Sequence, residues 1–239
     1  MPTRLELVKA SQASYSDKSP ENYTKVEDLS DKDIQTFKHN TENHHIITHR
    51  GTDLNADTAK RDLKTDLKIL LGQASHTKLF NDRAKRTEEI VKTLKDKDAD
   101  TKIHLSGHSL GATTLQHAMI KSKIVRDNVE SLDTFNAGTS PLQTKGLAKS
   151  NPAYKIIENK ATHHRIKGDG ISENAKSTLI GTIKTYKSNA KPSIGRKILN
   201  YLKPKLQHSI TGKILHFAGD KILSTLESHS LANFTKSEN

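Results

Sequence analysis

The sequence contains neither cysteine nor tryptophan among its 239 residues. The absence of cysteine excludes a disulfide scaffold and thiolate chemistry. No run of about 18 or more apolar residues occurs, so we expect no membrane-spanning helix. The opening residues, "MPTRLELVKASQASYS", lack the long apolar segment of a secretory signal peptide. These absences predict an intracellular protein or one that binds a membrane peripherally.

Apolar and aromatic residues are also scarce. Hydrophobic residues make up 32% of the chain, aromatic residues 4%, and the mean hydropathy is -0.72. So polar a composition is also typical of disordered chains, but apolar runs such as "HHIITH" and "TKIHLSG" argue for a packed core. We therefore expect one domain over residues 1–239. Its expected parts are an N-terminal helical and loop segment (1–43), a core (44–172), a basic amphipathic helical insertion (173–227) and a tail (228–239).

Positive charge is plentiful and unevenly distributed. The formal net charge is +12, and the segment from Asn174 to Lys213 holds nine Lys or Arg residues and no Asp or Glu. Such a block suits an anionic phospholipid surface, a nucleic acid or an acidic partner, although a solvated helix surface accounts for it equally well. Without interleaved aromatic residues, we expect no specific nucleic-acid binding. The residues expected to contact an anionic membrane are Lys176, Lys184, Lys187, Lys191, Arg196, Lys197, Lys203 and Lys205.

Strand and helix patterns alternate through the core. Period-two alternation or short apolar runs predict strands at 44–49, 101–107, 131–135 and 163–169. Apolar residues at helical spacing predict a helix over 81–98 and another directly after Ser109. This alternation predicts an α/β fold with a mostly parallel central sheet flanked by helices. Farther along, apolar spacing over 193–207 and 209–227 predicts two basic amphipathic helices.

The segment "SGHSLGA" places Ser109 between Gly107 and Gly111, in the order Gly-x-Ser-x-Gly. Its position between a predicted strand and a predicted helix is the context that a nucleophilic serine on a sharp turn requires. A serine hydroxyl also needs a base, an acid to orient the base, and hydrogen-bond donors for the oxyanion. The backbone N–H of Leu110 is one such donor. Thr52, in "HRGT" after an earlier strand, is expected to supply the second.

In the α/β-hydrolase arrangement the acid follows the serine along the chain. The candidate acids after Ser109 are Asp127, Asp133, Glu158, Asp169, Glu173 and Asp220. Asp169 is best placed, because it closes a predicted strand and lies between two glycines. Asp133 begins its predicted strand, so we expect it at the opposite edge of the sheet as a solvated carboxylate.

The base must follow the acid, which leaves His208, His216 and His229. His216 lies within a predicted helix, where a structural histidine is usual. His229 lies just after a predicted helix, in a loop able to reach the active edge, and is favoured; His208 is the runner-up. Although histidine is abundant, no HExxH-type or paired-carboxylate spacing occurs, so we expect neither a metal nor a cofactor.

These segments resemble, in order, those of the class 3 (fungal-type) lipases, a family of the α/β-hydrolase superfamily. "HRGT" resembles the family's oxyanion segment, "IHLSGHSLGA" its nucleophile elbow, and "DTFNAGTSP" the strand and turn that follow. "HRIKGDGIS" is similar to the strand carrying its acid, and "HSLANF" to its terminal histidine segment. The resemblance covers about residues 40–172 and the last dozen. The basic segment from Asn174 to Lys213 has no matching part in the family.

The resemblance implies an α/β-hydrolase fold with Ser109 as nucleophile, Asp169 as acid, His229 as base, and Thr52 with Leu110 as oxyanion donors. It implies cleavage of carboxylic esters of lipids, either acylglycerols or phospholipids. Two other functions remain open. One is a non-catalytic interaction protein that binds an anionic membrane or nucleic acid through the basic block. The other is an esterase that acts on small soluble esters.

Overall fold

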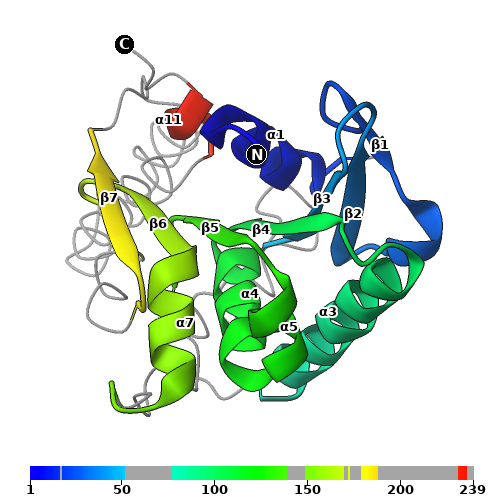
Figure 1. Ribbon diagram of the computed structural model, residues 1–239. Coiled ribbons are helices and arrows are strands. Elements are labelled where there is room, and N and C mark those ends of the chain that lie inside the picture. The colour runs from blue at the N-terminus through cyan, green and yellow to red at the C-terminus, as the bar shows by residue number, and fades with distance from the viewer. Residues whose placement is uncertain are drawn as a thin grey trace.

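The computed structural model describes residues 1–16, 18–51, 77–138, 149–169, 172, 179–187 and 231–235. These residues form an α/β arrangement, in which one sheet lies between two layers of helices (Figure 1). Buried apolar side chains fill both interfaces between the sheet and the helices. The predicted α/β class with a mostly parallel sheet is therefore confirmed.

The sheet has seven strands in the order β1-β2-β3-β4-β5-β6-β7. The strands β1, β2 and β3 pair antiparallel, whereas every pair from β3 to β7 is parallel. Parallel strands place all their carboxyl ends at one edge of the sheet. The strand bounds are β1 Tyr23–Lys25, β2 Ile34–His39, β3 His44–His49, β4 Lys102–His108, β5 Ser131–Phe135, β6 Ala161–Ile166 and β7 Thr182–Tyr186.

The helices divide between the two faces according to their place in the chain (Figure 1). Helices α3 (Thr77–Lys97), α4 (Leu110–Lys121), α5 (Lys123–Asn128) and α7 (Pro152–Lys160) connect successive parallel strands and cover one face. Right-handed crossovers that always advance in the same direction bring their helices to the same face. Helices α1 (Arg4–Ala13) and α11 (Ala232–Thr235), from opposite ends of the chain, cover the other face. The 3-10 helix η1 spans Glu27–Leu29.

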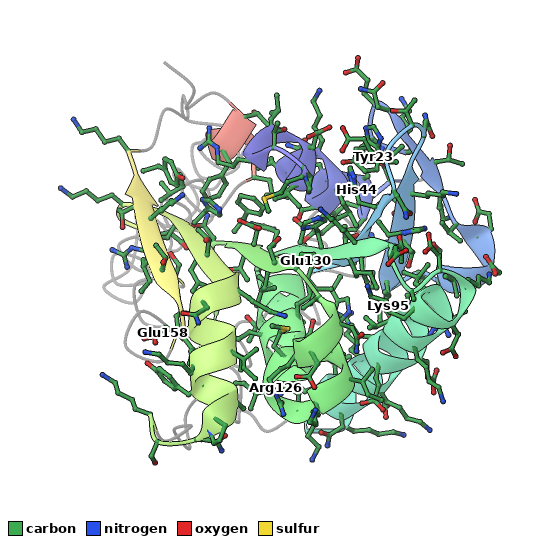
Figure 2. All side chains as sticks on the ribbon, in the orientation of Figure 1. Tyr23, His44, Lys95, Arg126, Glu130 and Glu158 are labelled. Carbon is green, nitrogen blue, oxygen red and sulfur yellow. The ribbon has the colours of Figure 1, made fainter. Side chains whose placement is uncertain are left out.

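Lysine side chains form hydrogen bonds with backbone carbonyls at the edge of the sheet where the parallel strands begin. The ammonium of Lys160 donates to the carbonyls of Arg126 and Val129 at the end of α5, at 2.8 and 2.6 Å. The ammonium of Lys95 donates to the carbonyl of Thr101 at 2.7 Å, directly before β4. Cations at helix ends satisfy unpaired carbonyls and complement the helix dipole. Figure 2 shows Lys95 and Arg126 among the side chains on the face of the sheet that α3, α4, α5 and α7 cover.

The strands predicted at 44–49, 101–107, 131–135 and 163–169 and both core helices are confirmed, with small differences at their ends. The helix predicted within 1–43 is present as α1, but the description of this segment as helix and loop misses β1 and β2. Their short polar sequences lack a clear apolar alternation. Pairing of β2 with β3, and of β1 with β2, decides their conformation.

The prediction of a helical segment over 173–227 is wrong at 182–186, which forms β7 beside β6. Threonine, isoleucine and tyrosine residues there favour a strand. The two basic helices predicted over 193–227 lie outside the described residues. Among the helices that the structure describes, none combines the length and the apolar character needed to cross a bilayer.

Candidate active site

Ser109 occupies the sharp turn between β4 and α4. Its backbone has φ 57 and ψ -125, a conformation that residues other than glycine rarely adopt. The N–H of Ser109 donates to the carbonyl of Phe135 at 3.0 Å, which ties the turn to the end of β5. Because α4 begins at Leu110, the backbone N–H of Leu110 has no partner within the helix. An available N–H beside a strained serine fits the arrangement predicted from "SGHSLGA".

The glycines that flank this turn are required by close packing. A Cβ atom at Gly111 would lie 2.0 Å from the carbonyl oxygen of His49, at the end of β3. A Cβ atom at Gly107 would lie 2.8 Å from the backbone nitrogen of Ala112. These distances are far inside van der Waals contact, so only glycine lets the first turn of α4 approach β3 and β4 this closely.

The end of β3 passes directly beside the serine. A Cβ atom at Gly51 would lie 3.3 Å from the Cβ of Ser109 and 2.7 Å from the carbonyl oxygen of His108. The described residues of the segment "HRGT" therefore meet the serine turn, although Gly51 and Ser109 are 58 residues apart in the sequence. Thr52 itself lies outside the described residues.

His49, the last residue of β3, is fully buried between helices α3 and α4. Its Nδ1 is 2.8 Å from the hydroxyl of Thr114, and its Nε2 is 2.8 Å from the hydroxyl of Thr87. Burial, with a smaller contribution from the nearby cation of Arg83, lowers the pKa of His49 well below its usual value. His49 is therefore neutral at physiological pH and anchors the strand end by two hydrogen bonds.

Arg83 reaches from α3 to the backbone that follows His49. One of its guanidinium nitrogens donates to the carbonyl of Arg50 at 2.7 Å, and another pairs with Asp33 at 3.1 Å. The N–H of Arg50 donates to the carbonyl of Asp33 at 2.8 Å. The buried guanidinium thus fixes the backbone where β3 ends. No sequence pattern singled out Arg83.

The turn after β5 is organised by Asn136, which also has a positive φ of 48°. Its N–H donates to the carbonyl of His164 at 2.8 Å, and its side-chain oxygen accepts from the N–H of Ile166 at 2.9 Å. Thr113 connects this turn to the serine, because its hydroxyl accepts from the N–H of Gly138 and donates to the carbonyl of Ser109. Asparagine followed closely by glycine after a strand is a usable turn signal for Asn136.

Asp169 follows β6 at the same edge of the sheet and is fully buried. Its N–H donates to the carbonyl of Ile166 at 3.1 Å, and its Oδ2 accepts from the N–H of Ser172 at 3.1 Å. Gly168, with φ 87, makes the turn. Strand β6 is two places from β4, and each strand spacing is about 4.8 Å, so the carboxyl ends of these two strands are roughly 10 Å apart along the sheet.

The expectation that Asp133 begins its strand as a solvated carboxylate is wrong. It is the third residue of β5, and its side chain is 16% exposed. Its Oδ1 is 3.0 Å from Nε2 of His164, and its Oδ2 accepts from the hydroxyl of Ser131 at 3.2 Å. The pairing was not visible in the sequence, because it requires the register between β5 and β6.

The other candidate acids divide into exposed residues and residues that are not described. Asp127 and Glu158 form helical ion pairs at the surface with Lys123 and Lys155. Glu173 and Asp220 lie outside the described residues, as do His208, His216 and His229. Within the described part of the chain, no group of three or more His, Asp or Glu residues is arranged to hold a metal ion.

The end of the described chain packs against this region. The ring of Phe234 lies 5.1 Å from that of Phe135 and 5.9 Å from that of Tyr186. Leu231 is buried in the same apolar cluster. The C-terminal segment therefore docks beside the last residue of β5, close to the edge that carries Ser109.

Comparisons with known proteins assign no family. No family model matches this chain, and a search of curated proteins finds no match. The arrangement brings together a strained serine at the start of a helix, a glycine-bearing loop against that serine, and a buried carboxylate at the same edge of the sheet.

Proposed function

We propose that this protein is a serine hydrolase that cleaves carboxylic esters, built on the α/β-hydrolase plan of the class 3 lipases. The observation that carries the proposal is the left-handed backbone of Ser109, held between β4 and α4 with the Gly51 loop against it. Strain of this kind persists only where surrounding contacts impose it, and it is concentrated at functional sites.

In the proposed mechanism, Ser109 attacks the acyl carbonyl while His229 takes the hydroxyl proton. Asp169 orients the imidazole and stabilises its protonated form. The N–H of Leu110 and that of Thr52 stabilise the oxyanion. Collapse of the tetrahedral intermediate expels the alcohol, which receives the proton from His229. Water then hydrolyses the acyl-enzyme by the same steps.

The docking of the C-terminal segment supports His229 as the base. Leu231 is buried near the end of β5, and a residue two positions away lies within about 7 Å of it along any chain. Ser109 and Asp169 follow strands whose ends are roughly 10 Å apart, a separation that one imidazole placed between the two side chains can bridge.

A lipid ester at an anionic surface is the substrate that best suits the charge. Each Lys or Arg close to an anionic bilayer contributes about 1 kcal/mol of binding free energy, which salt weakens. Nine such residues between Asn174 and Lys213, without acidic neighbours in that segment, would concentrate the enzyme at such a surface. We therefore include lipid esters in anionic vesicles in the test of function.

The test compares wild type with Ser109→Ala by fluorophosphonate labelling and by turnover of a short soluble ester and of a lipid ester in anionic and neutral vesicles. Ser106→Ala is the matched control, because Ser106 is a buried serine three residues earlier, bonded to Ser11 and to the carbonyl of Leu7. We expect Ser109→Ala to lose labelling and at least about 1,000-fold in kcat. Ser106→Ala should keep both.

Equal labelling of wild type and Ser109→Ala would show that the nucleophile is misassigned. Absence of labelling and turnover in wild type would favour the non-catalytic interaction protein. Faster cleavage of lipid in anionic than in neutral vesicles supports the lipid substrate. Turnover of the soluble ester alone would instead identify an esterase for small substrates.

A further inference from the structure

We infer that Tyr15 is a positioning residue for the oxyanion loop of this site, an inference that rests on the proposed hydrolase function. Tyr15 lies just after the end of α1, and its hydroxyl fixes the peptide group between Arg50 and Gly51. That peptide group directly precedes the proposed oxyanion donor, Thr52. The N-terminal segment thereby becomes part of the active site, although it lies outside every sequence motif.

The peptide group between Arg50 and Gly51 is held at both ends. Its N–H, on Gly51, donates to the hydroxyl of Tyr15 at 3.0 Å. Its carbonyl, on Arg50, accepts from the guanidinium of Arg83 at 2.7 Å. Because a peptide group is planar, two bonds on opposite sides of it prevent rotation of the plane. This clamp fixes the orientation of the peptide group on the N-terminal side of Gly51.

The same hydroxyl contacts the serine turn. It is 3.2 Å from Nδ1 of His108, the residue before the nucleophile. The point where a Gly51 Cβ would lie is 2.3 Å from the Tyr15 hydroxyl and 3.3 Å from the Cβ of Ser109. The Tyr15 hydroxyl and the Ser109 side chain therefore approach Gly51 from the same side, and the hydroxyl bonds both to the Gly51 loop and to the residue before the nucleophile.

The ring of Tyr15 has separate contacts that a phenylalanine would keep. The Arg50 guanidinium lies 5.6 Å from the centre of the ring, and the His108 ring meets it edge-on at 6.2 Å. Replacing tyrosine by phenylalanine thus removes the hydrogen bonds of the hydroxyl while preserving the packing. This separation makes the positioning role testable.

Oxyanion donors accelerate a reaction only when they are aimed where the negative charge develops. Gly51 has no side chain and a wide range of accessible backbone angles, so its peptide depends on outside contacts for its orientation. Loss of the Tyr15 hydroxyl leaves one of the two contacts. The donor at residue 52 is then misdirected in the transition state, while ground-state binding of the ester is little affected.

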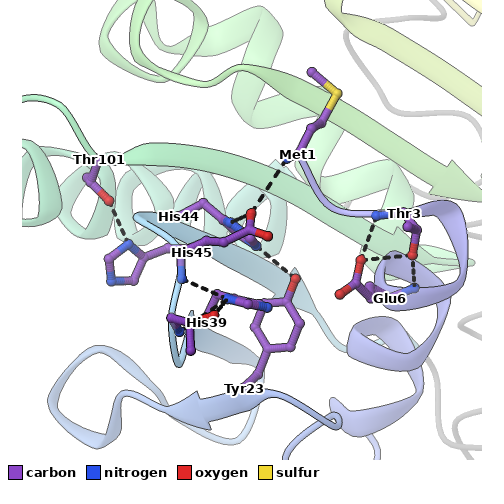
Figure 3. Close-up of polar contacts among 10 residues, drawn as sticks. Met1, Thr3, Glu6, Tyr23, His39, His44, His45 and Thr101 are labelled. Carbon is purple, nitrogen blue, oxygen red and sulfur yellow. Dashed lines mark hydrogen bonds and ion pairs between the residues drawn. The ribbon is translucent and has the colours of Figure 1, made fainter.

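The test is Tyr15→Phe, with Tyr23→Phe as the matched control. The Tyr23 hydroxyl also bonds to a histidine, at 2.8 Å from Nε2 of His44, but it lies among the N-terminal strands (Figure 3). We expect Tyr15→Phe to lower kcat for a soluble ester at least about tenfold and to change KM less than about threefold. Fluorophosphonate labelling should slow in parallel. Tyr23→Phe should leave kcat, KM and labelling as in wild type.

Thermal unfolding of both variants separates positioning from stability. Similar midpoints with a kcat loss only in Tyr15→Phe support the inference. An unchanged kcat in Tyr15→Phe, or equal losses in both variants, overturns it while the Ser109-dependent activity stands. If wild type itself shows no Ser109-dependent turnover, the proposed function fails, and the inference about Tyr15 fails with it.

Discussion

At the scale of single residues, two glycines near the site are needed for different reasons. Gly111 lies where a Cβ atom would come within 2.0 Å of the His49 carbonyl oxygen. Gly168, before Asp169, has φ 87 but no heavy atom within 4 Å of where its Cβ would be. The first glycine is required by space and the second by backbone conformation.

Alanine substitution distinguishes these two causes. We expect Gly111→Ala to lower the free energy of unfolding by about 3 kcal/mol, because backbone atoms of β3 and α4 would have to separate. Gly168→Ala should cost only about 1 kcal/mol, the usual strain of a left-handed residue. Urea unfolding measures both. Equal effects would show that close packing of α4 on β3 is not what requires glycine at 111.

At the scale of elements, the N-terminus of α1 is stabilised by a capping box, in which Thr3 and Glu6 bond to each other's backbone (Figure 3). The N–H of Thr3 donates to the carboxylate of Glu6 at 2.7 Å, and the N–H of Glu6 donates to the hydroxyl of Thr3 at 3.3 Å. Burial raises the pKa of Glu6, but the hydrogen bonds from Thr3 and the nearby His39 and His44 together outweigh it, so the pKa is lowered. The helix that delivers Tyr15 to the site is therefore anchored at its first residue.

Removing this cap should weaken α1. We expect Thr3→Ala to lower the free energy of unfolding by about 1 kcal/mol at neutral pH. Because the pKa of Glu6 is lower in the folded state, the stabilisation by its carboxylate is complete above the ordinary value of 4.5 and is lost as pH falls through the folded value. The difference between wild type and Thr3→Ala should therefore shrink in acid. Thr24→Ala, at an exposed threonine bonded to Asn40, serves as the control in urea unfolding.

At the scale of the whole molecule, the sheet buries several neutral histidines. Burial is the largest cause that lowers the pKa of His45, His104, His117 and His163, each to about 4. These residues lie on β3, β4, α4 and β6, so they are spread across the protein. The folded state therefore resists protonation at several separate points.

This distribution predicts sensitivity to mild acid. The unfolded chain binds protons at these histidines near pH 6.5, whereas the folded protein does not until about pH 4. The histidines thus contribute their full stabilisation above their pKa in the unfolded chain, and this stabilisation is lost as the pH falls from that pKa to the pKa in the folded protein. We expect the free energy of unfolding to decrease by about 3 kcal/mol or more over that interval.

Urea unfolding at a series of pH values measures this loss. High salt is the control, because it screens repulsion among the many surface cations but leaves burial of the histidines unchanged. A loss that persists in high salt supports the histidine explanation. A free energy of unfolding that stays constant down to about pH 5 contradicts it.

The sequence by itself determined the α/β class and the order of the core elements, because apolar periodicity and the glycines around Ser109 are local signals. It also placed Ser109 on a strand-to-helix turn, where the structure has it, and made Asp169 the last residue of a strand, which in the structure ends three residues earlier, at Ile166. The roles of these two residues in catalysis remain predictions. The roles of Thr52 and His229 also remain predictions, because these two residues lie outside the described part of the chain.

Only the tertiary structure decided which distant residues support the site. Strand pairing and register, which depend on contacts far apart in the chain, turned Asp133 into a partner of His164 and made strands of β1, β2 and β7. Packing of α1 and α3 against the sheet brought Tyr15 and Arg83 to one peptide group. No local sequence pattern around the tyrosine or the arginine indicates these contacts, because their partners are far away in the sequence and are brought close only by folding.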